Sequence, residues 1–267
     1  MIKRPKRLVL LGRSLGHSLS PIFQNAALQQ AQLPLRYETL DIPASAIDGT
    51  LEELSAQDAA GNVTVPYKQD VFARCDRLMD SAKRAGAVNT FWFERGELVG
   101  DNTDVAGFDA AARELLQGER AGLTIGLIGA GGVAGAVLAA IEGWRESKAL
   151  VSNRTTERAR ALCARFSSVA QLSDVDCIAR EADLVVNATT LGLRDDALPV
   201  DPSRLRPSAA VLDVVYRRGE TAWVRAARSR GLRARDGLLM LVEQGAVAFE
   251  RWFGFAPDRD AMWRSMQ

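Results

Sequence analysis

Short apolar runs alternate along this chain with longer segments in which apolar residues recur at helical spacing. The runs at Arg7–Gly12, Thr124–Ile128 and Leu184–Asn187 have the length of buried strands and are too short for typical helices. Strands of this kind, separated by helical segments, are typical of parallel sheets with helical crossovers. The pattern therefore predicts an α/β protein.

The remaining predicted elements continue this alternation. Further strands are expected at 36–41, 61–65, 87–93, 98–100, 149–152, 210–215 and Arg233–Arg235. Helices are expected at 20–30, 47–54, 105–117, 156–166, 221–230 and Leu238–Phe253, with a short one at the end. The segment 167–182 shows no clear period and is expected to be irregular. Because a new α/β unit begins at Thr124, we place a domain boundary after residue 104.

A glycine-rich turn follows the strand Thr124–Ile128. It reads Gly129-Ala130-Gly131-Gly132-Val133-Ala134 and leads into a helical stretch of small apolar residues and then another strand. Strand, glycine turn, helix and strand together form the context of a dinucleotide-binding fingerprint. Gly129 permits the tight turn, Gly131 lets the backbone approach a pyrophosphate, and the free N–H groups of the helix start face the diphosphate. This loop therefore predicts a dinucleotide cofactor.

The end of the next strand indicates which dinucleotide is bound. It reads Asn153-Arg154-Thr155, with Arg158 one helical turn further on. NAD pockets usually place Asp or Glu here to bind the ribose 2′-hydroxyl, and a carboxylate would repel a 2′-phosphate. A guanidinium instead pairs with a phosphate in bidentate geometry. The predicted cofactor is NADP.

Composition narrows the possible partners and chemistry. The 267 residues carry a net charge of +1 and no apolar stretch of membrane-spanning length, so we expect neither a nucleic-acid nor a membrane partner. Three cysteines without metal spacing indicate reduced thiols in the cytoplasm and no metal.

The segment Gly12-Arg13-Ser14-Leu15-Gly16 matches the nucleophile elbow of serine hydrolases, but the single histidine, His17, leaves no downstream base. A serine hydrolase is therefore not expected.

The N-terminal half offers candidate ligand contacts. Ser20 is expected to cap the first helix, with Pro21 as its first residue, and Ser18 then keeps a hydroxyl free for a carboxylate or polyol. The alternative that both serines only cap the helix stays open.

Lys68 lies just beyond the strand at 61–65, where open sheets bind ligands, and lysine can act as a general acid–base. By local rules, Thr103 or Asp104 is only an N-cap.

A series of short motifs spans nearly the whole chain. In order they are HSLSP, NVTVPYK, GAVNT, GDNTD, GAGGVA, NRT, NATTLG, DVVY and DGLLMLVEQGAVAF. This set resembles the shikimate dehydrogenase family. The resemblance implies an N-terminal α/β substrate-binding domain of residues 1–104 and 237–267, with the last long helix returning to it, and a Rossmann NADP-binding domain of residues 105–236. It also implies NADP-dependent interconversion of 3-dehydroshikimate and shikimate in aromatic amino-acid biosynthesis.

The resemblance assigns roles to individual residues. It makes Lys68 the catalytic lysine, paired with Asp104, and it agrees with the need of ketone reduction for a proton donor. The implied substrate-binding residues are Ser18, Ser20, Thr64, Asn89, Tyr216 and Gln244. The implied cofactor-binding residues are Gly129, Ala130, Gly131, Gly132, Val133, Asn153, Arg154, Thr155, Arg158, Thr189, Val214 and Gly237.

Alternatives remain open on the sequence alone. Gly135 and Leu239 stand where many family members carry arginine and glycine, which leaves room for a paralogue acting on quinate or amino-shikimate. An inactive NADP-binding sensor is a further alternative, against which the retention of Lys68 and Asp104 argues. The expected assembly is a monomer or a homodimer.

Overall fold

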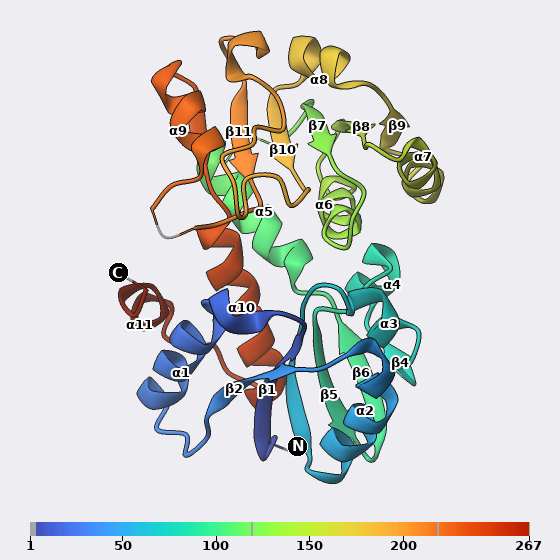
Figure 1. Cartoon of the computed structure of the whole chain (residues 1–267), viewed down its shortest axis with the longest axis vertical. Helices are drawn as coiled ribbons and strands as arrows, with labels where there is room; N and C mark the ends of the chain where they lie inside the picture. The colour runs from blue at the N-terminus through green and yellow to red at the C-terminus, as the bar shows by residue number, and fades with distance from the viewer. Residues whose placement is uncertain (1–3, 119, 218, 267) are drawn as a thin grey trace. The chain divides into compact units, whose positions relative to one another are not determined.

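The computed structural model describes residues 4–118, 120–217 and 219–266, which form two compact units (Figure 1). The first unit runs to Gly107 and resumes at Leu241, and the second comprises Phe108–Met240. These divisions fall inside helices α5 (Asp104–Leu115) and α10 (Leu238–Phe253), whereas the sequence places them just before these helices. The roles of the two units as substrate and cofactor domains stay predictions at this point.

The sheet of the first unit is mixed. Strand β1 pairs in parallel with β2 and β3, while β3, β5 and β6 pair in antiparallel fashion and β4 pairs in parallel with β6. The strand order is therefore β2-β1-β3-β5-β6-β4. The strands are β1 (Arg7–Gly12), β2 (Tyr37–Asp41), β3 (Ala59–Val63), β4 (Arg77–Leu78), β5 (Thr90–Glu94) and β6 (Glu97–Asp101). The two-residue β4 is too short to leave a pattern in the sequence.

Helices cover both faces of this sheet, which explains why β1 is apolar from Leu8 to Leu11. Leu8 and Leu10 face a core shared with α1, α10 and α11, whereas Val9 and Leu11 face a second core under α2, α3 and α4. Figure 1 shows α2, α3 and α4 together beside this sheet. The helices are α1 (Ser20–Gln30), α2 (Ile47–Ala56), α3 (Lys68–Phe72), α4 (Asp80–Ala85) and α11 (Arg259–Arg264).

The sheet of the second unit is entirely parallel, with the order β12-β11-β10-β7-β8-β9. Successive strands proceed outward from β7 in one direction and from β10 in the other, which is the doubly wound Rossmann arrangement predicted from the sequence. Ligands bind such sheets at the carboxyl ends of the two strands where the order reverses. The strands are β7 (Thr124–Ile128), β8 (Lys148–Ser152), β9 (Ala170–Leu172), β10 (Leu184–Asn187), β11 (Ala210–Asp213) and β12 (Arg233–Arg235). The intervening helices are α6 (Ala134–Ile141), α7 (Thr156–Arg165), α8 (Val175–Glu181) and α9 (Ala222–Ser229).

The expectation that 167–182 is irregular is wrong. This segment forms β9, which pairs with β8, and the seven-residue helix α8. Both elements are too short to show a period. Helix α8 nevertheless packs closely on the sheet, because a Cβ at Gly126 would lie 2.3 Å from Cγ2 of Ile178. The sequence does carry one signal for it, since the Asp174 side chain accepts a hydrogen bond from the Cys177 N–H and so caps the helix.

This cap yields a stability prediction. Asp174→Ala removes the acceptor at the N-terminus of α8 and should lower the free energy of unfolding by about 0.5–2 kcal/mol. Ser173→Ala is the matched control, since that hydroxyl bonds to no other residue in the described part of the chain. Urea denaturation of the three proteins measures the difference, and equal stability of all three would show that the cap contributes nothing.

Candidate active site

A lysine and a carboxylate from two separate elements meet in the first unit. Lys68 begins α3, shortly after β3, and Asp104 begins α5, shortly after β6. Their Nζ and Oδ2 atoms lie 2.5 Å apart, and the two side chains are 14% and 7% exposed. An ammonium held against a carboxylate at the edge of solvent can donate a proton in a fixed direction and be oriented while it does so.

The buried side chain of Asn89, just before β5, connects this pair to its surroundings. Its Nδ2 group donates to Asp104 Oδ1 at 2.9 Å, to Thr103 Oγ1 at 2.9 Å and to Gln244 Oε1 at 3.1 Å. Its Oδ1 atom accepts from the Thr103 N–H at 2.7 Å. Residues predicted from distant parts of the sequence, namely Lys68, Asn89, Asp104 and Gln244, are thus brought together. The geometry forms a polar cluster suited to bind hydroxyl groups of a ligand.

Thr103 and Asp104 are more than helix caps. The Thr103 hydroxyl lies 3.1 Å from Asn89 Oδ1, and the Asp104 carboxylate is occupied by Lys68 and Asn89. The Asn102 side chain, instead, accepts the Asp104 N–H at 3.1 Å. The expectation that Thr103 or Asp104 only caps the helix is therefore wrong. The sequence signal for Asn102 and Thr103 was their place in the GDNTD motif.

The serine pair differs from the expected capping arrangement. Helix α1 begins at Ser20, which is thus not its N-cap, and Ser18 Oγ accepts the Ser20 N–H at 3.3 Å. The helix starts one residue earlier than expected, so the N-cap is Leu19, and neither serine side chain makes the capping bond that the sequence predicted for Ser20. Ser20 is the more buried of the two, and its hydroxyl has no hydrogen-bond partner within the ranges that the structure describes. The hydroxyl of Ser20, and not that of Ser18 as expected, is thus the one without a partner among the described residues.

Two further residues predicted to contact a substrate lie in different units. Thr64 follows β3, and its N–H bonds to the Leu11 carbonyl at 2.9 Å. Its methyl group packs against Gly12, where a Cβ would lie only 2.6 Å from it. Tyr216 follows β11 and belongs to the second unit. Its proposed contact with a substrate stays a prediction.

The glycine loop after β7 has the geometry expected of a diphosphate cradle. Gly129 has a φ of 118°, and a Cβ there would lie 2.7 Å from the backbone carbonyl of Ala188, so only glycine fits. A Cβ at Gly131 would meet no protein atom closer than 3.9 Å and would fill open space instead. Among the described residues, the N–H groups of Gly131, Gly132 and Val133 have no acceptor. The start of α6 can therefore bind an anionic group.

Asn153 links this loop to the predicted 2′-phosphate residues. Its Oδ1 accepts the Ala130 N–H at 3.1 Å, and its Nδ2 donates to the Thr155 carbonyl at 2.8 Å. Arg154 and Arg158 are exposed, and neither guanidinium pairs with a carboxylate in the part of the chain that the structure describes. Arginines without an internal partner are available to an anionic ligand.

A second buried asparagine organises the ends of β10 and β11. Asn187 Oδ1 accepts from the N–H and hydroxyl of Thr189, at 3.0 and 2.7 Å, and Asn187 Nδ2 donates to Asp213 Oδ1 at 2.9 Å. Val214 donates its N–H to the Asn187 carbonyl, and a Cβ at Gly237 would lie 2.1 Å from the Val214 carbonyl oxygen. Thr189, Val214 and Gly237 are therefore positioned together at the same edge of the sheet. Asn187 and Asp213 were contained in the NATTLG and DVVY motifs, but no role was predicted for them.

Asp213 is fully buried, and burial raises its pKa from 3.8 to about 6. Hydrogen bonds from Thr221 and Asn187 oppose this shift without cancelling it. Asp213 therefore takes up a proton at a higher pH in the folded protein than an exposed aspartate does, with half of the molecules protonated near pH 6. No cluster of three or more metal-ligating side chains occurs among the residues described.

Comparisons with known proteins identify the family of this chain. A family model described as the shikimate dehydrogenase substrate binding domain matches residues 10–91, one for shikimate / quinate 5-dehydrogenase matches 110–192, and one for the shikimate 5′-dehydrogenase C-terminal domain matches 237–267. The chain is 43% identical over 267 residues to shikimate dehydrogenase (NADP(+)) of Rubrobacter xylanophilus, which covers 96% of this chain and 94% of that protein. The enzyme of the same name from Methylocella silvestris is 40% identical over 258 residues, covering 94% of this chain and 91% of that protein.

A solved structure is also similar. Shikimate 5-dehydrogenase from Thermus thermophilus, in complex with NADP(H) and shikimate, superposes with a TM-score of 0.88 at 37% sequence identity and covers 97% of each chain. The similarity extends over both units of the chain.

The pKa of Asp213 predicts a specific pH dependence. Because the folded-state pKa is raised above the unfolded value, this carboxyl destabilises the fold above pH 6, and the destabilisation is relieved as the pH falls from 6 towards 4. Asp213→Asn keeps an acceptor and cannot titrate. Relative to this variant, the wild-type free energy of unfolding should rise by about 1 kcal/mol between pH 7 and pH 5. Urea titrations at both pH values measure it, and a constant difference would contradict the raised pKa.

Proposed function

Because the chain belongs to the shikimate dehydrogenase family, we propose that it interconverts 3-dehydroshikimate and shikimate with NADP as the redox partner. The observation that carries this proposal is the Lys68–Asp104 pair, bound by Asn89 within a cluster of hydroxyl-binding side chains. A carbonyl reduction needs a proton donor beside the developing alkoxide, and this pair supplies one. Shikimate, with a carboxylate and several ring hydroxyls, matches the acceptors and donors of the first unit.

The residues of the second unit fit NADP. The cradle beyond Gly129, with unpaired N–H groups at the start of α6, suits a diphosphate, and the exposed Arg154 and Arg158 suit the 2′-phosphate. The remaining proposed contacts are Ala130, Gly131, Gly132, Val133, Asn153, Thr155, Thr189, Val214 and Gly237. When bound, NADPH supplies the hydride for reduction of the carbonyl.

Residues of the chain itself donate and accept the proton. Lys68 Nζ donates a proton to the carbonyl oxygen as it becomes a hydroxyl, and it takes that proton back in the reverse direction. Asp104 holds the ammonium through Oδ2, while Oδ1 is fixed by the Asn89 amide. Since both oxygens have a partner, the carboxylate cannot rotate freely, and the direction of the Lys68 ammonium is restricted with it.

The other polar residues position the substrate. Ser18 and Ser20, at the start of α1, are proposed to bind its carboxylate. Thr64, Asn89 and Gln244 are proposed to bind the ring hydroxyls, with Tyr216 as a further contact. Gln244 is oriented by a hydrogen bond from its Nε2 to the Leu241 carbonyl at 2.8 Å, so that its Oε1 faces Asn89.

Parallel rate measurements test the function itself. NADP⁺ reduction should be fastest with shikimate when shikimate, quinate and amino-shikimate are supplied separately at equal concentration. Faster reduction with quinate or amino-shikimate would favour the paralogue, to which one matching family model, shikimate / quinate 5-dehydrogenase, lends support. Binding of NADP without turnover of any of the three would instead identify a sensor.

We further propose that the protein acts in the cytoplasm as a monomer or homodimer. Cys75, Cys163 and Cys177 are free thiols, as is usual in a reducing compartment. Among the described residues, no helix is both long and apolar enough to span a bilayer. Sedimentation equilibrium of the full chain distinguishes the two assemblies.

The role of Lys68 can be tested by removing its charge. Lys68→Met keeps the length of the side chain but cannot donate a proton, so turnover should fall by about a hundredfold or more, with NADP binding retained. Lys83→Met is the control, because Lys83 forms only an exposed pair with Asp80. Steady-state oxidation of shikimate measures the turnover of both variants. Turnover of Lys68→Met within twofold of wild type would rule out Lys68 as the proton carrier.

Cofactor choice is tested at Arg154. Arg154→Ala should weaken NADP binding by about 1.5–3 kcal/mol, the range for a hydrogen bond to a charged group, while NAD binding changes little. Arg160→Ala, which removes an exposed arginine of α7, serves as the control. Titration calorimetry with both dinucleotides gives the affinities. Equal weakening of NAD and NADP would mean that Arg154 supports the fold and does not recognise the phosphate.

A further inference from the structure

Helix α10 contacts the segment 101–104 at two separate points. Gln244 and Arg251 are seven residues apart, so they lie on the same face of the helix, about 10 Å apart along its axis. Gln244 Oε1 accepts from the Thr103 hydroxyl at 3.4 Å, and Arg251 Nε donates to Asp101 Oδ2 at 2.9 Å. Between them, the fully buried Ala248 packs into the core of the first unit. The helix thus contacts the segment that carries Asp104 at Asp101 and at Thr103.

The Asp101 carboxylate at the end of β6 is almost fully buried, with 2% of its side chain exposed. Oδ1 accepts hydrogen bonds from the Ser81 hydroxyl and from the Asn102 N–H, the latter at 2.7 Å, while Oδ2 accepts from Arg251. Arg251 forms the only ion pair of Asp101 among the described residues. A buried carboxylate is stable only when it is paired and hydrogen-bonded, so Arg251 determines whether Asp101 can hold this arrangement.

The arrangement of Asp101 is transmitted directly to Asp104. Asp101 fixes the N–H of Asn102, and the Asn102 side chain then bonds in two directions. Its Nδ2 donates to the Ala87 carbonyl at 2.8 Å, and its Oδ1 accepts the N–H of Asp104 at 3.1 Å. The three hydrogen bonds made by Asn102, to Asp101, to the Ala87 carbonyl and to the Asp104 N–H, all join buried groups. The backbone position of Asp104 therefore depends on Asp101, and through it on Arg251.

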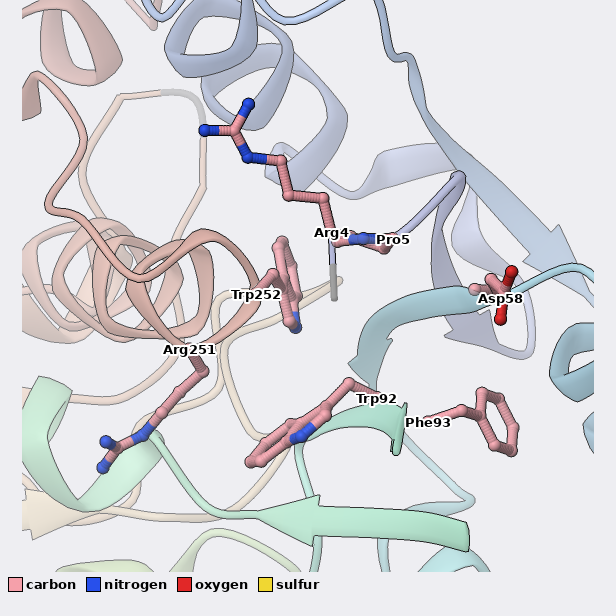
Figure 2. Close-up of a pocket in the computed structure, with 8 residues that line it drawn as sticks. Arg4, Pro5, Asp58, Trp92, Phe93, Arg251 and Trp252 are labelled. Atoms are coloured by element: carbon pink, nitrogen blue, oxygen red, sulfur yellow. The ribbon is translucent and has the colours of Figure 1, made fainter. Parts of the chain in front are cut away.

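Arg251 itself lies outside the candidate active site. It lines a shallow pocket together with Trp92, Trp252 and Arg4, and Figure 2 shows its guanidinium pointing away from Trp252. None of the substrate-binding or catalytic residues proposed above lines this pocket, as far as the described residues show. Its side chain is 46% exposed. An effect of Arg251 on catalysis must therefore act through Asp101.

We propose that Arg251 is a positioning residue, which sets the place of Asp104 relative to Lys68 through Asp101 and Asn102. The proposal rests on the catalytic role assigned to Asp104 under the proposed function. Loss of the guanidinium leaves the buried Asp101 carboxylate without its cation, and the segment 101–104 shifts to bring that charge towards water. A small displacement of a group that orients the proton donor lowers catalysis without touching the dinucleotide-binding loop.

Three single variants of the full-length protein test this. Arg251→Met removes the cation and should lower kcat/KM for shikimate by about tenfold, with the KM for NADP⁺ within twofold of wild type. Arg251→Lys keeps a cation and should recover most of the loss. Arg259→Met is the matched control, because it removes an Nε-to-carboxylate pair between α11 and Glu243 of α10, at 3.0 Å, and neither partner bonds to the segment 101–104 among the described residues. The kcat/KM of Arg259→Met for shikimate should stay within twofold of the wild-type value.

A double-mutant cycle separates positioning from general destabilisation. Asp101→Asn removes the buried charge, so adding Arg251→Met to it should change kcat/KM less than twofold further. An equal loss from Arg251→Met in both backgrounds, or an equal loss from Arg259→Met, would overturn the proposal. So would kcat/KM of Arg251→Met within twofold of wild type. Wild-type protein that fails to oxidise shikimate would refute the proposed function instead, and NADP binding by each variant verifies that it is folded.

Discussion

The first unit depends on the hydrogen-bonding requirement of one buried amide, that of Asn89. Its side chain contacts Thr103, Asp104 and Gln244, and its backbone carbonyl accepts the Val63 N–H at 2.8 Å and the Asn62 amide at 3.1 Å. Buried polar groups must be paired, so each of these partners has little freedom to move. A single asparagine thereby joins two strands, a helix start and the last long helix around Lys68.

The second unit uses the same device for a different purpose. Asn187 lies at the end of β10, and its side-chain Oδ1 accepts hydrogen bonds from Thr189 while its Nδ2 donates to Asp213. The Asn89 side chain bonds to Thr103 and Asp104 in the same way. In both units a buried asparagine at a strand terminus orders a loop whose exposed atoms are left for a ligand. The energetic cost differs, because Asp213 has no cationic partner among the described residues and its pKa is raised, whereas Asp104 is paired with Lys68. The second unit thus carries an unfavourable buried charge near Asn187, whereas the charge near Asn89 in the first unit is paired.

Sequence patterns predicted both sheets, the glycine loop and the residues that meet at the candidate site. They succeeded where a local signal exists, such as the apolar run of β7. They failed for β4, β9 and α8, which are too short to show a period, and for Ser20, where the helix start shifted by one residue. The Asp101–Arg251 pair could not be predicted, because 150 residues separate its partners and only folding brings them together.

We propose that shikimate binds and exchanges its proton at the polar cluster around Lys68, Asn89 and Asp104. A crystal structure of the protein with shikimate bound would show the contacts at this cluster. We expect one ring hydroxyl within hydrogen-bonding distance of both Lys68 Nζ and the Asp104 carboxylate, and the substrate carboxylate at the hydroxyls of Ser18 and Ser20. Shikimate bound without contact to Lys68 or Asp104 would contradict it.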